Sequence, residues 1–180
     1  LNTTERGTRV DDVDVERATQ DAHSFIVDLL KCALKYSPNV KLSYLPGNHA
    51  PMVDYMFTFG IKQLFPQVEV DGTVDHFKHV WLGEHSIFFH HGDRRRVTNK
   101  LVEVIVSKFA KEWGESKSRY LITGHLHHEK SLSNSGLTHY QVSSPSKSTS
   151  YERDNGFNTS ESGLMLFEFD DVKRRAIYYL

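Results

Sequence analysis

The sequence predicts an α/β protein: a mixed β-sandwich flanked by helices, in the layer order α/β/β/α. Extended and helical segments alternate in the first part of the chain, whereas extended segments dominate the later part. Two apolar runs, at 87–89 and 120–123, are typical of strands that are buried on both faces. A chain of 180 residues is long enough to bury a sizeable core, so we expect a single domain over residues 1–180.

Two helices and two strands are predicted before residue 75. Apolar residues recur at three- and four-residue steps through 11–36, which predicts an amphipathic helix that ends before Pro38. A strand follows at 40–45 and is stopped by a Pro-Gly pair. A second helix is expected over 52–64 and a short strand over 68–70.

The rest of the chain is predicted to hold three hairpins, one helix and one further strand. The first hairpin pairs 77–82 with 86–90, the second turns near Gly136, and the third joins 164–169 to 176–179. Helical spacing covers 97–113, and the buried strand at 120–123 follows it. The Ser-, Thr- and Asn-rich segment 143–162 is expected to be a long surface loop.

Composition excludes several kinds of site and partner. The net charge of −1 gives no global positive field of the kind that attracts nucleic acid, which leaves only local basic patches for such a partner. Cys32 is the only cysteine, which excludes an intramolecular disulfide and a cysteine-ligated zinc site and fits a cytoplasmic protein. No apolar run reaches the roughly 20 residues of a membrane span, so no membrane partner is expected.

Three polar segments each follow a predicted strand, and together they hold five candidate site residues. These are Asn48 and His49 after the first strand, His91 after the strand at 86–90, and His125 and His127 after the strand at 120–123. Ligands of open α/β sheets gather at the carboxyl ends of strands, so we expect the three segments to meet in one site. A surface position is expected for most other histidines: His23, His76, His79, His85 and His139.

The residue types in these segments fit a metal centre, because imidazole nitrogen and amide oxygen both bind borderline divalent ions. His125 and His127 lie two apart, so an extended backbone points both to the same side. Asn48 and His49 are adjacent and diverge, so one can hold a metal ion while the other reaches a substrate. Taken singly, each segment has a structural alternative, such as carbonyl-bonded histidines at 90–91 or a turn asparagine.

These segments, in this order, resemble the motifs of the calcineurin-like metallophosphoesterase superfamily. Residues 46–49 match its Gly-Asn-His-Asp/Glu motif, 91–92 match its single-histidine motif, and 124–127 match its Gly-His-x-His motif. The resemblance is specific over about residues 40–130. It looks closest to the repair-exonuclease-like and phage-encoded members.

The resemblance implies two divalent metal ions, which would be Mn, Fe or Zn, and a role for each motif residue. Asn48, His91 and His125 would hold the second ion, and His127 would hold the first. His49 would be the general acid that protonates the leaving group, while a metal-activated hydroxide attacks the phosphorus. His91 is preferred to the histidine before it, because the family ligand usually precedes the glycine directly.

The sequence departs from the family pattern in two places. Ala50 stands where the family usually has an acidic residue that orients the catalytic histidine, which leaves Asp54 as a substitute. Before Asn48 there is neither an Asp-x-His after a strand nor a Gly-Asp-x-x-Asp, the motifs that supply the remaining ligands. Because the chain begins at Leu1, we expect a domain that is incomplete at its N-terminus, with its first strands missing and its edges covered by a homo-oligomer or another domain.

The likeness to repair-exonuclease-like members favours phosphodiester hydrolysis on nucleic acid, a nuclease-like activity. Arg94 and Arg95 follow the single histidine and would offer phosphate contacts, although a solvated charged turn is the alternative for them. Two other functions stay open. One is a phosphomonoesterase or protein phosphatase, and the other is a catalytically inactive metal-binding or interaction module.

Overall fold

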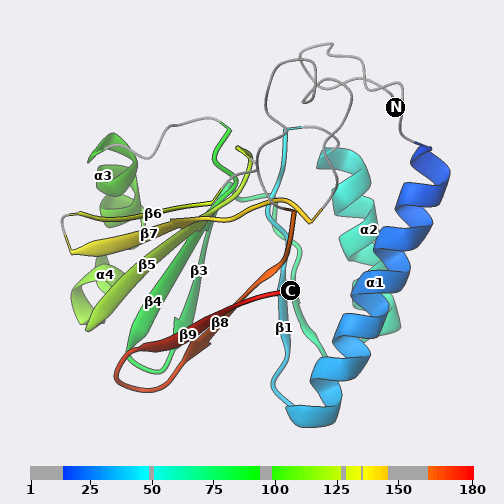
Figure 1. The fold of residues 1–180 in the computed structure, drawn as a ribbon, viewed down its shortest axis with the longest axis horizontal. Coiled ribbons are helices and arrows are strands. Elements are labelled where there is room, and N and C mark those ends of the chain that lie inside the picture. The colour runs from blue at the N-terminus through cyan, green and yellow to red at the C-terminus, as the bar shows by residue number, and fades with distance from the viewer. Residues whose placement is uncertain (1–13, 49–50, 94–98, 127–128, 135, 146–161) are drawn as a thin grey trace. The chain divides into compact units, whose positions relative to one another are not determined.

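A computed structural model describes residues 14–48, 51–93, 99–126, 129–134, 136–145 and 162–180 (Figure 1). The chain divides into two compact units, Leu1–Asp75 and His76–Leu180. The protein is α/β, with helices flanking parallel and antiparallel strands, as the sequence predicted. The expectation of one domain over the whole chain stays a prediction.

The first unit combines two helices with a two-stranded parallel sheet. Helix α1 (Val15–Tyr36) begins at the N-cap Asp14. Strand β1 (Lys41–Ser43) pairs with β2 (Glu69–Asp71), and helix α2 (Pro51–Leu64) connects them. The buried core of the unit comes from both helices and the approach to β2: Leu30, Ile61, Phe65 and Val68. Within the residues that the structure describes, no helix is both long and apolar enough to cross a bilayer.

The second unit is built on a five-stranded mixed sheet with the strand order β3-β4-β5-β7-β6. Along the chain these strands are Phe77–Leu82, His85–His90, Ser118–Thr123, Lys130–Asn134 and Leu137–Gln141. Strand β5 pairs in parallel with β4 and with β7, whereas β3 and β6 are antiparallel edges. Both predicted apolar runs therefore lie in inner strands, where neighbours pair with them on both sides.

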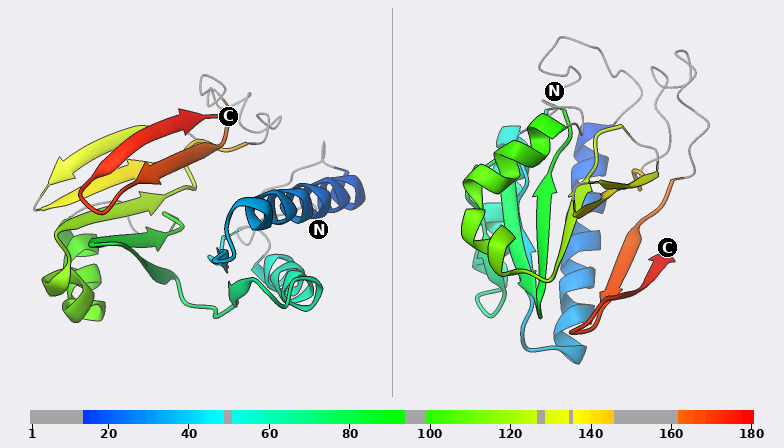
Figure 2. Two further views of the ribbon diagram at one scale, coloured as in Figure 1. Left: turned by 90° about the horizontal axis from the view of Figure 1, so that it is seen from below. Right: turned by 90° about the vertical axis from the view of Figure 1, so that its left-hand side faces the viewer.

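Helices cover one face of the five-stranded sheet (Figure 2). They are α3 (Asn99–Lys108) and α4 (Ala110–Glu115). Fully buried side chains from the sheet and α3 form the core of the unit: Phe88, Leu101, Ile105 and Leu121, with Leu137 beside them. Burying this apolar surface is the main favourable contribution to folding, because each such side chain adds about 1.5–3 kcal/mol.

A hairpin covers the other face of the sheet (Figure 2). It consists of β8 (Met165–Phe169) and β9 (Arg174–Tyr179), close to the predicted ranges. The ring of Phe169 lies 5.0 Å from that of Tyr120 on β5, measured between centroids. Helices, five-stranded sheet and hairpin thus form three successive layers.

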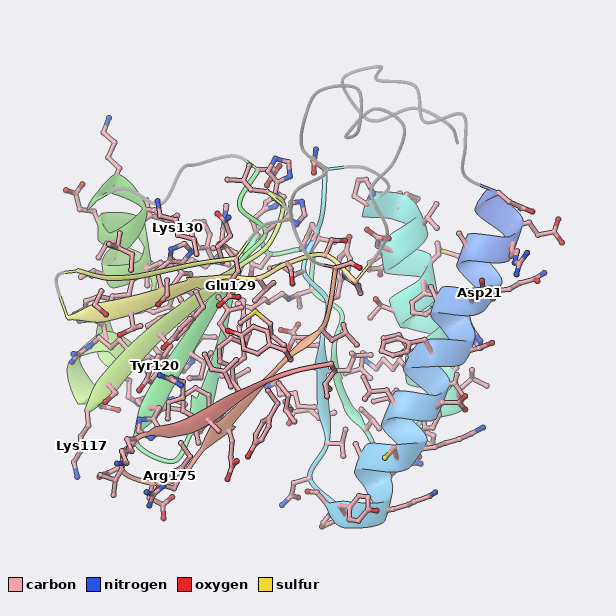
Figure 3. All side chains as sticks on the ribbon, viewed as in Figure 1. Asp21, Lys117, Tyr120, Glu129, Lys130 and Arg175 are labelled. Carbon is pink, nitrogen blue, oxygen red and sulfur yellow. The ribbon has the colours of Figure 1, made fainter. Side chains whose placement is uncertain are left out.

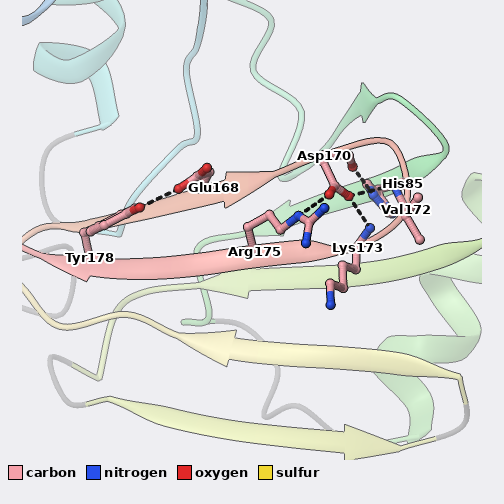
Figure 4. A network of polar contacts seen from close by, with 7 residues as sticks. All are labelled: His85, Glu168, Asp170, Val172, Lys173, Arg175 and Tyr178. Atoms are coloured by element: carbon pink, nitrogen blue, oxygen red, sulfur yellow. Dashed lines mark hydrogen bonds and ion pairs between the residues drawn. The ribbon is translucent and has the colours of Figure 1, made fainter.

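The turn of this hairpin is held by Asp170 (Figure 4). Its carboxylate accepts hydrogen bonds from the Val172 and Lys173 amides and pairs with Arg175. These interactions, with the Lys173 amide the strongest, hold the pKa of Asp170 below its usual value. The Asp170 carbonyl accepts a hydrogen bond from His85 Nε2 at 2.7 Å, so the turn is also tied to β4.

Two sequence predictions about the second unit are wrong. The helix expected over 97–113 is broken at Phe109, which has φ −124° and ψ 44° while its ring packs on Phe88. Tertiary packing here outweighs the helical period of the sequence. His85 and His139, expected at the surface, are only 0% and 4% exposed. Nε2 of each ring makes a hydrogen bond, to a carbonyl for His85 and to a threonine hydroxyl for His139, while Nδ1 of His85 is buried without a partner among the described residues.

Candidate metal centre

The parallel register of β4 and β5 brings two of the candidate residues together. The last residues of the two strands are opposite each other, so the segments 91–93 and 124–126 leave the sheet side by side. The Gly124 amide donates a hydrogen bond to the His91 carbonyl at 3.1 Å. The rings of His91 and His125 are 5.1 Å apart between centroids and inclined at 64°.

This separation suits two imidazoles that bind one ion. A metal–nitrogen bond of about 2.1 Å places a ring centroid roughly 3.2 Å from the ion, so two such rings at octahedral or tetrahedral angles lie roughly 4.6–5.3 Å apart. The 5.1 Å between the ring centroids of His91 and His125 falls within that range. Two neutral imidazoles are a suitable partial donor set for a divalent transition-metal ion.

His125 has a backbone conformation that residues with a Cβ seldom adopt, with φ at 70°. The Leu126 amide donates to the Gly124 carbonyl at 2.9 Å, so His125 is the apex of a γ-turn. A conformation of this kind costs about 1–2 kcal/mol and persists where the surrounding structure imposes it, commonly at functional sites. The positive φ of this γ-turn therefore distinguishes His125 from a loop histidine with ordinary backbone angles.

Gly92 is the counterpart on the other segment, with φ at 107°. A Cβ at this position would lie 3.0 Å from the Gly124 carbonyl oxygen and 3.4 Å from His125 Cβ. The two segments are therefore in direct backbone contact, and only glycine combines this φ with so close an approach.

His90, which directly precedes His91, is buried in the protein interior. It is 2% exposed, and its ring lies 4.6 Å from that of Phe77 between centroids. Its Nδ1 accepts a hydrogen bond from the Gly92 amide at 3.0 Å. Between the two adjacent histidines, this geometry favours His91 as the metal ligand.

Asn48 belongs to the first unit, in the segment between β1 and α2. The Tyr44 hydroxyl spans this segment by donating to the Pro51 carbonyl at 2.8 Å. Burial, followed by the charge of Asp54, raises the pKa of Tyr44. The hydroxyl is protonated at neutral pH, as tyrosine ordinarily is, and the raised pKa extends its role as a donor to higher pH.

Four other candidates lie outside the described residues: His49, Arg94, Arg95 and His127. Among the residues that are described, no group of three or more His, Cys, Asp or Glu side chains is placed to hold a metal ion. The roles assigned to Asn48, His91 and His125 stay predictions as well. The structure supplies one pair of close imidazoles on two adjacent strand ends.

Sequence reasoning missed a buried polar pair at the end of β5. Thr123 Oγ1 lies 2.8 Å from His139 Nε2. Burial, and then the positive charge of Lys130, lower the pKa of His139 to about 4. His139 is therefore neutral at pH 7 and acts as a hydrogen-bond partner. The available signal was its two-residue spacing from Leu137, which places both side chains on one face of β7.

The chain beyond the Gly-His-x-His segment is anchored at Glu129, beside Lys130 (Figure 3). Its carboxylate accepts a hydrogen bond from the Tyr179 hydroxyl at 2.6 Å. This bond is the largest of several causes that raise the pKa of Tyr179. The chain is thus fixed on both sides of the segment, by β5 before it and by the contact with β9 after it.

Comparisons with known proteins give only a partial likeness of fold. No family model and no curated protein matches the chain. A double mutant of Vps29 from Entamoeba histolytica is 17% identical, covers 78% of this chain and 74% of its own, and has a TM-score of 0.46. Wild-type Vps29 from the same organism, complexed with Zn²⁺, is 13% identical over 78% of this chain and 80% of its own, with a TM-score of 0.42.

A third solved structure is a conserved uncharacterized protein from Streptococcus pneumoniae, described as a predicted phosphoesterase. It is 12% identical, covers 78% of this chain and 87% of its own, and has a TM-score of 0.39. At these identities and TM-scores, no property of the three proteins transfers to this chain.

Proposed function

We propose that this chain is a metal-dependent phosphoesterase whose centre is built around His91 and His125. The proposal is carried by one observation: two imidazoles 5.1 Å apart on adjacent strand ends, one of them on a residue held at positive φ. The order of the surrounding motifs favours phosphoester hydrolysis over other metal-dependent chemistry.

In this proposal Asn48, His91 and His125 hold one divalent ion, and His127 belongs to a second. The ions would be Mn, Fe or Zn. When bound, they would supply positive charge to phosphoryl oxygens and lower the pKa of a coordinated water. The chain's own contribution is to hold the donor atoms in place, and His125 does so on a strained turn that the fold imposes.

His49 is the proposed general acid, which donates a proton to the departing alkoxide. Arg94 and Arg95 are proposed to contact phosphate oxygens, where a guanidinium offers paired N–H donors. The substrate class is a phosphodiester, with nucleic acid as the partner. We further propose a homo-oligomer and a cytoplasmic location; Cys32, the only cysteine in the sequence, is a free thiol, which fits a reducing compartment.

A second candidate function is a metal-binding or interaction module without turnover. It is favoured by Ala50, which stands where the resembled family usually has the acidic residue that orients the catalytic histidine, here His49. Both candidate functions use His91 and His125 to bind metal, and they differ only in whether a substrate is hydrolysed.

Hydrolysis of bis(p-nitrophenyl) phosphate and of p-nitrophenyl phosphate, each with added Mn²⁺, tests the proposal. We expect diester turnover by the wild-type chain, loss of it in His125→Ala, and retention in His23→Ala. His23 is an exposed imidazole on α1 that the proposed centre does not use, so it controls for removal of any histidine.

The outcomes separate the candidates. Turnover of only the monoester assigns a phosphomonoesterase or protein phosphatase. Binding of Mn²⁺ without any turnover assigns the non-catalytic module. Turnover that survives in His125→Ala contradicts the proposed centre.

A further inference from the structure

We propose that His90 is a positioning residue for the metal centre: its buried imidazole fixes the backbone turn that places His91 beside His125. This inference rests on the proposed function, and it assigns a role to a buried histidine outside the proposed ligand set.

The first support is the hydrogen bond to Gly92. The Gly92 amide is the donor at 3.0 Å, so Nδ1 of His90 must present a lone pair and carry no proton. A neutral imidazole in this tautomer suits a side chain that is only 2% exposed and packs on Phe77. His90 thus satisfies a backbone donor at the point where the chain leaves β4.

The turn at Gly92 also brings the two segments of the centre into backbone contact. With φ at 107°, Gly92 lies against the Gly124 carbonyl at a distance that would bring an added Cβ to 3.0 Å. The Gly124 amide in turn donates to the His91 carbonyl. Two backbone contacts therefore link the segment that carries His91 to the segment that carries His125. The hydrogen bond between the Gly92 amide and His90 fixes the backbone of the first of these segments.

The third support is the geometry of the bond itself. A side-chain acceptor that bonds the amide two residues later is the arrangement of an Asx turn, which Asn and Asp normally make. Nδ1 of histidine occupies the same topological position as Oδ1 of asparagine. Asparagine at position 90 is therefore the conservative replacement, and leucine is the replacement that removes the acceptor.

Calorimetric titration with Mn²⁺ alone tests the role, using His90→Leu and His90→Asn in the full chain. Because changes to residues that orient a metal ligand typically weaken metal binding by 10–100-fold, we expect a loss of roughly that size in His90→Leu. We expect His90→Asn to bind within roughly threefold of the wild type. In the metal-free protein, amide exchange at Gly92 should be fast in His90→Leu and slow in His90→Asn.

His79→Leu is the matched control. His79 also lies on the helix-covered face and makes a side-chain hydrogen bond, to Ser86 at 3.1 Å. We expect it to lower the melting temperature as much as His90→Leu does while leaving Mn²⁺ affinity unchanged. That contrast separates a positioning role from general destabilisation.

Three outcomes would overturn the inference, and they distinguish a wrong role for His90 from a wrong proposed function. If the wild type binds Mn²⁺ and His90→Leu binds it equally well, or His90→Asn binds it as poorly as His90→Leu, the role of His90 is wrong and the proposed function stands. If the wild type binds no Mn²⁺, the proposed function falls, and the role of His90 falls with it.

Discussion

His125 combines a potential ligand side chain with a backbone conformation that disfavours any residue with a Cβ. Replacement by glycine should therefore relieve strain that replacement by alanine retains. We expect metal-free His125→Gly to be more stable than His125→Ala by about 1 kcal/mol, measured by urea unfolding with a chelator present.

The neighbouring position supplies the control for this prediction. Leu126 is exposed and does not have positive φ, so glycine there should be less stable than alanine by about 0.5–1 kcal/mol. The same sign of the Gly–Ala difference at both positions would contradict strain at His125.

The buried His139 makes stability depend on pH. Its pKa is about 4 in the folded protein and near 6.5 when exposed, so the unfolded chain binds more protons between these values. Stability should therefore be complete above pH 6.5 and fall as the pH drops toward 4. Between pH 7 and pH 4.5 we expect the wild type to lose about 2–3 kcal/mol more than His139→Gln in urea unfolding. Equal losses in the two proteins would show that His139 titrates normally.

At the scale of elements, the contact between the ends of β4 and β5 should depend on glycine at position 92. Gly92→Ala introduces both an unfavourable φ and a Cβ 3.0 Å from a backbone oxygen that cannot rotate away. Gly136→Ala also places a Cβ at positive φ, but at 76°, nearer the left-handed region that L-residues can adopt, and the nearest atom to its Cβ is a flexible Arg119 nitrogen at 3.9 Å. We expect Gly92→Ala to cost at least about 1 kcal/mol more than Gly136→Ala in unfolding free energy. Similar costs would mean that the two segments separate easily.

The β8–β9 hairpin should be held on the sheet chiefly by aromatic packing. Phe169 contacts Tyr120 and His85, with ring centroids 5.0 and 5.6 Å apart. Because Phe169 is half-buried, we expect Phe169→Ala to cost about 2–3 kcal/mol, near the lower end for core phenylalanines. Leu166→Ala, on the exposed side of the same strand, should change stability by less than about 0.5 kcal/mol. Similar effects of the two substitutions would show that the hairpin is not docked through its inner face.

Local sequence signals predicted most elements of the fold because each depends on a short pattern. The hairpin turns at Gly83 and Gly136 both contain glycine at positive φ, which the Gly-Glu and Asn-Ser-Gly sequences indicated. The helix break at Phe109 was not predictable, because it accompanies a ring contact with Phe88, a residue 21 positions earlier. Contacts of that kind leave no trace in the periodicity of a single segment.

At the scale of the whole molecule, the sequence supplied candidate residues for the chemistry, whose roles stay predictions, but not the way in which two of them are brought together. The sequence placed His91 and His125 directly after two predicted strands. The parallel pairing of β4 with β5 brings these two residues close together. Strand register depends on partners that are distant in sequence, so neither the ring separation nor the positive φ of His125 was available beforehand. Asn48 belongs to the other compact unit, and its membership of the same centre is a proposal.

The proposed centre requires His91 and His125 to bind the same divalent ion. Diffraction at the Mn absorption edge, from crystals of the full chain grown with Mn²⁺, tests it most directly by locating the ion. We expect an anomalous peak about 2 Å from one ring nitrogen of each histidine, and no such peak in His91→Ala. A wild-type crystal with no peak between the two imidazoles, or with its manganese only elsewhere on the molecule, would contradict the claim.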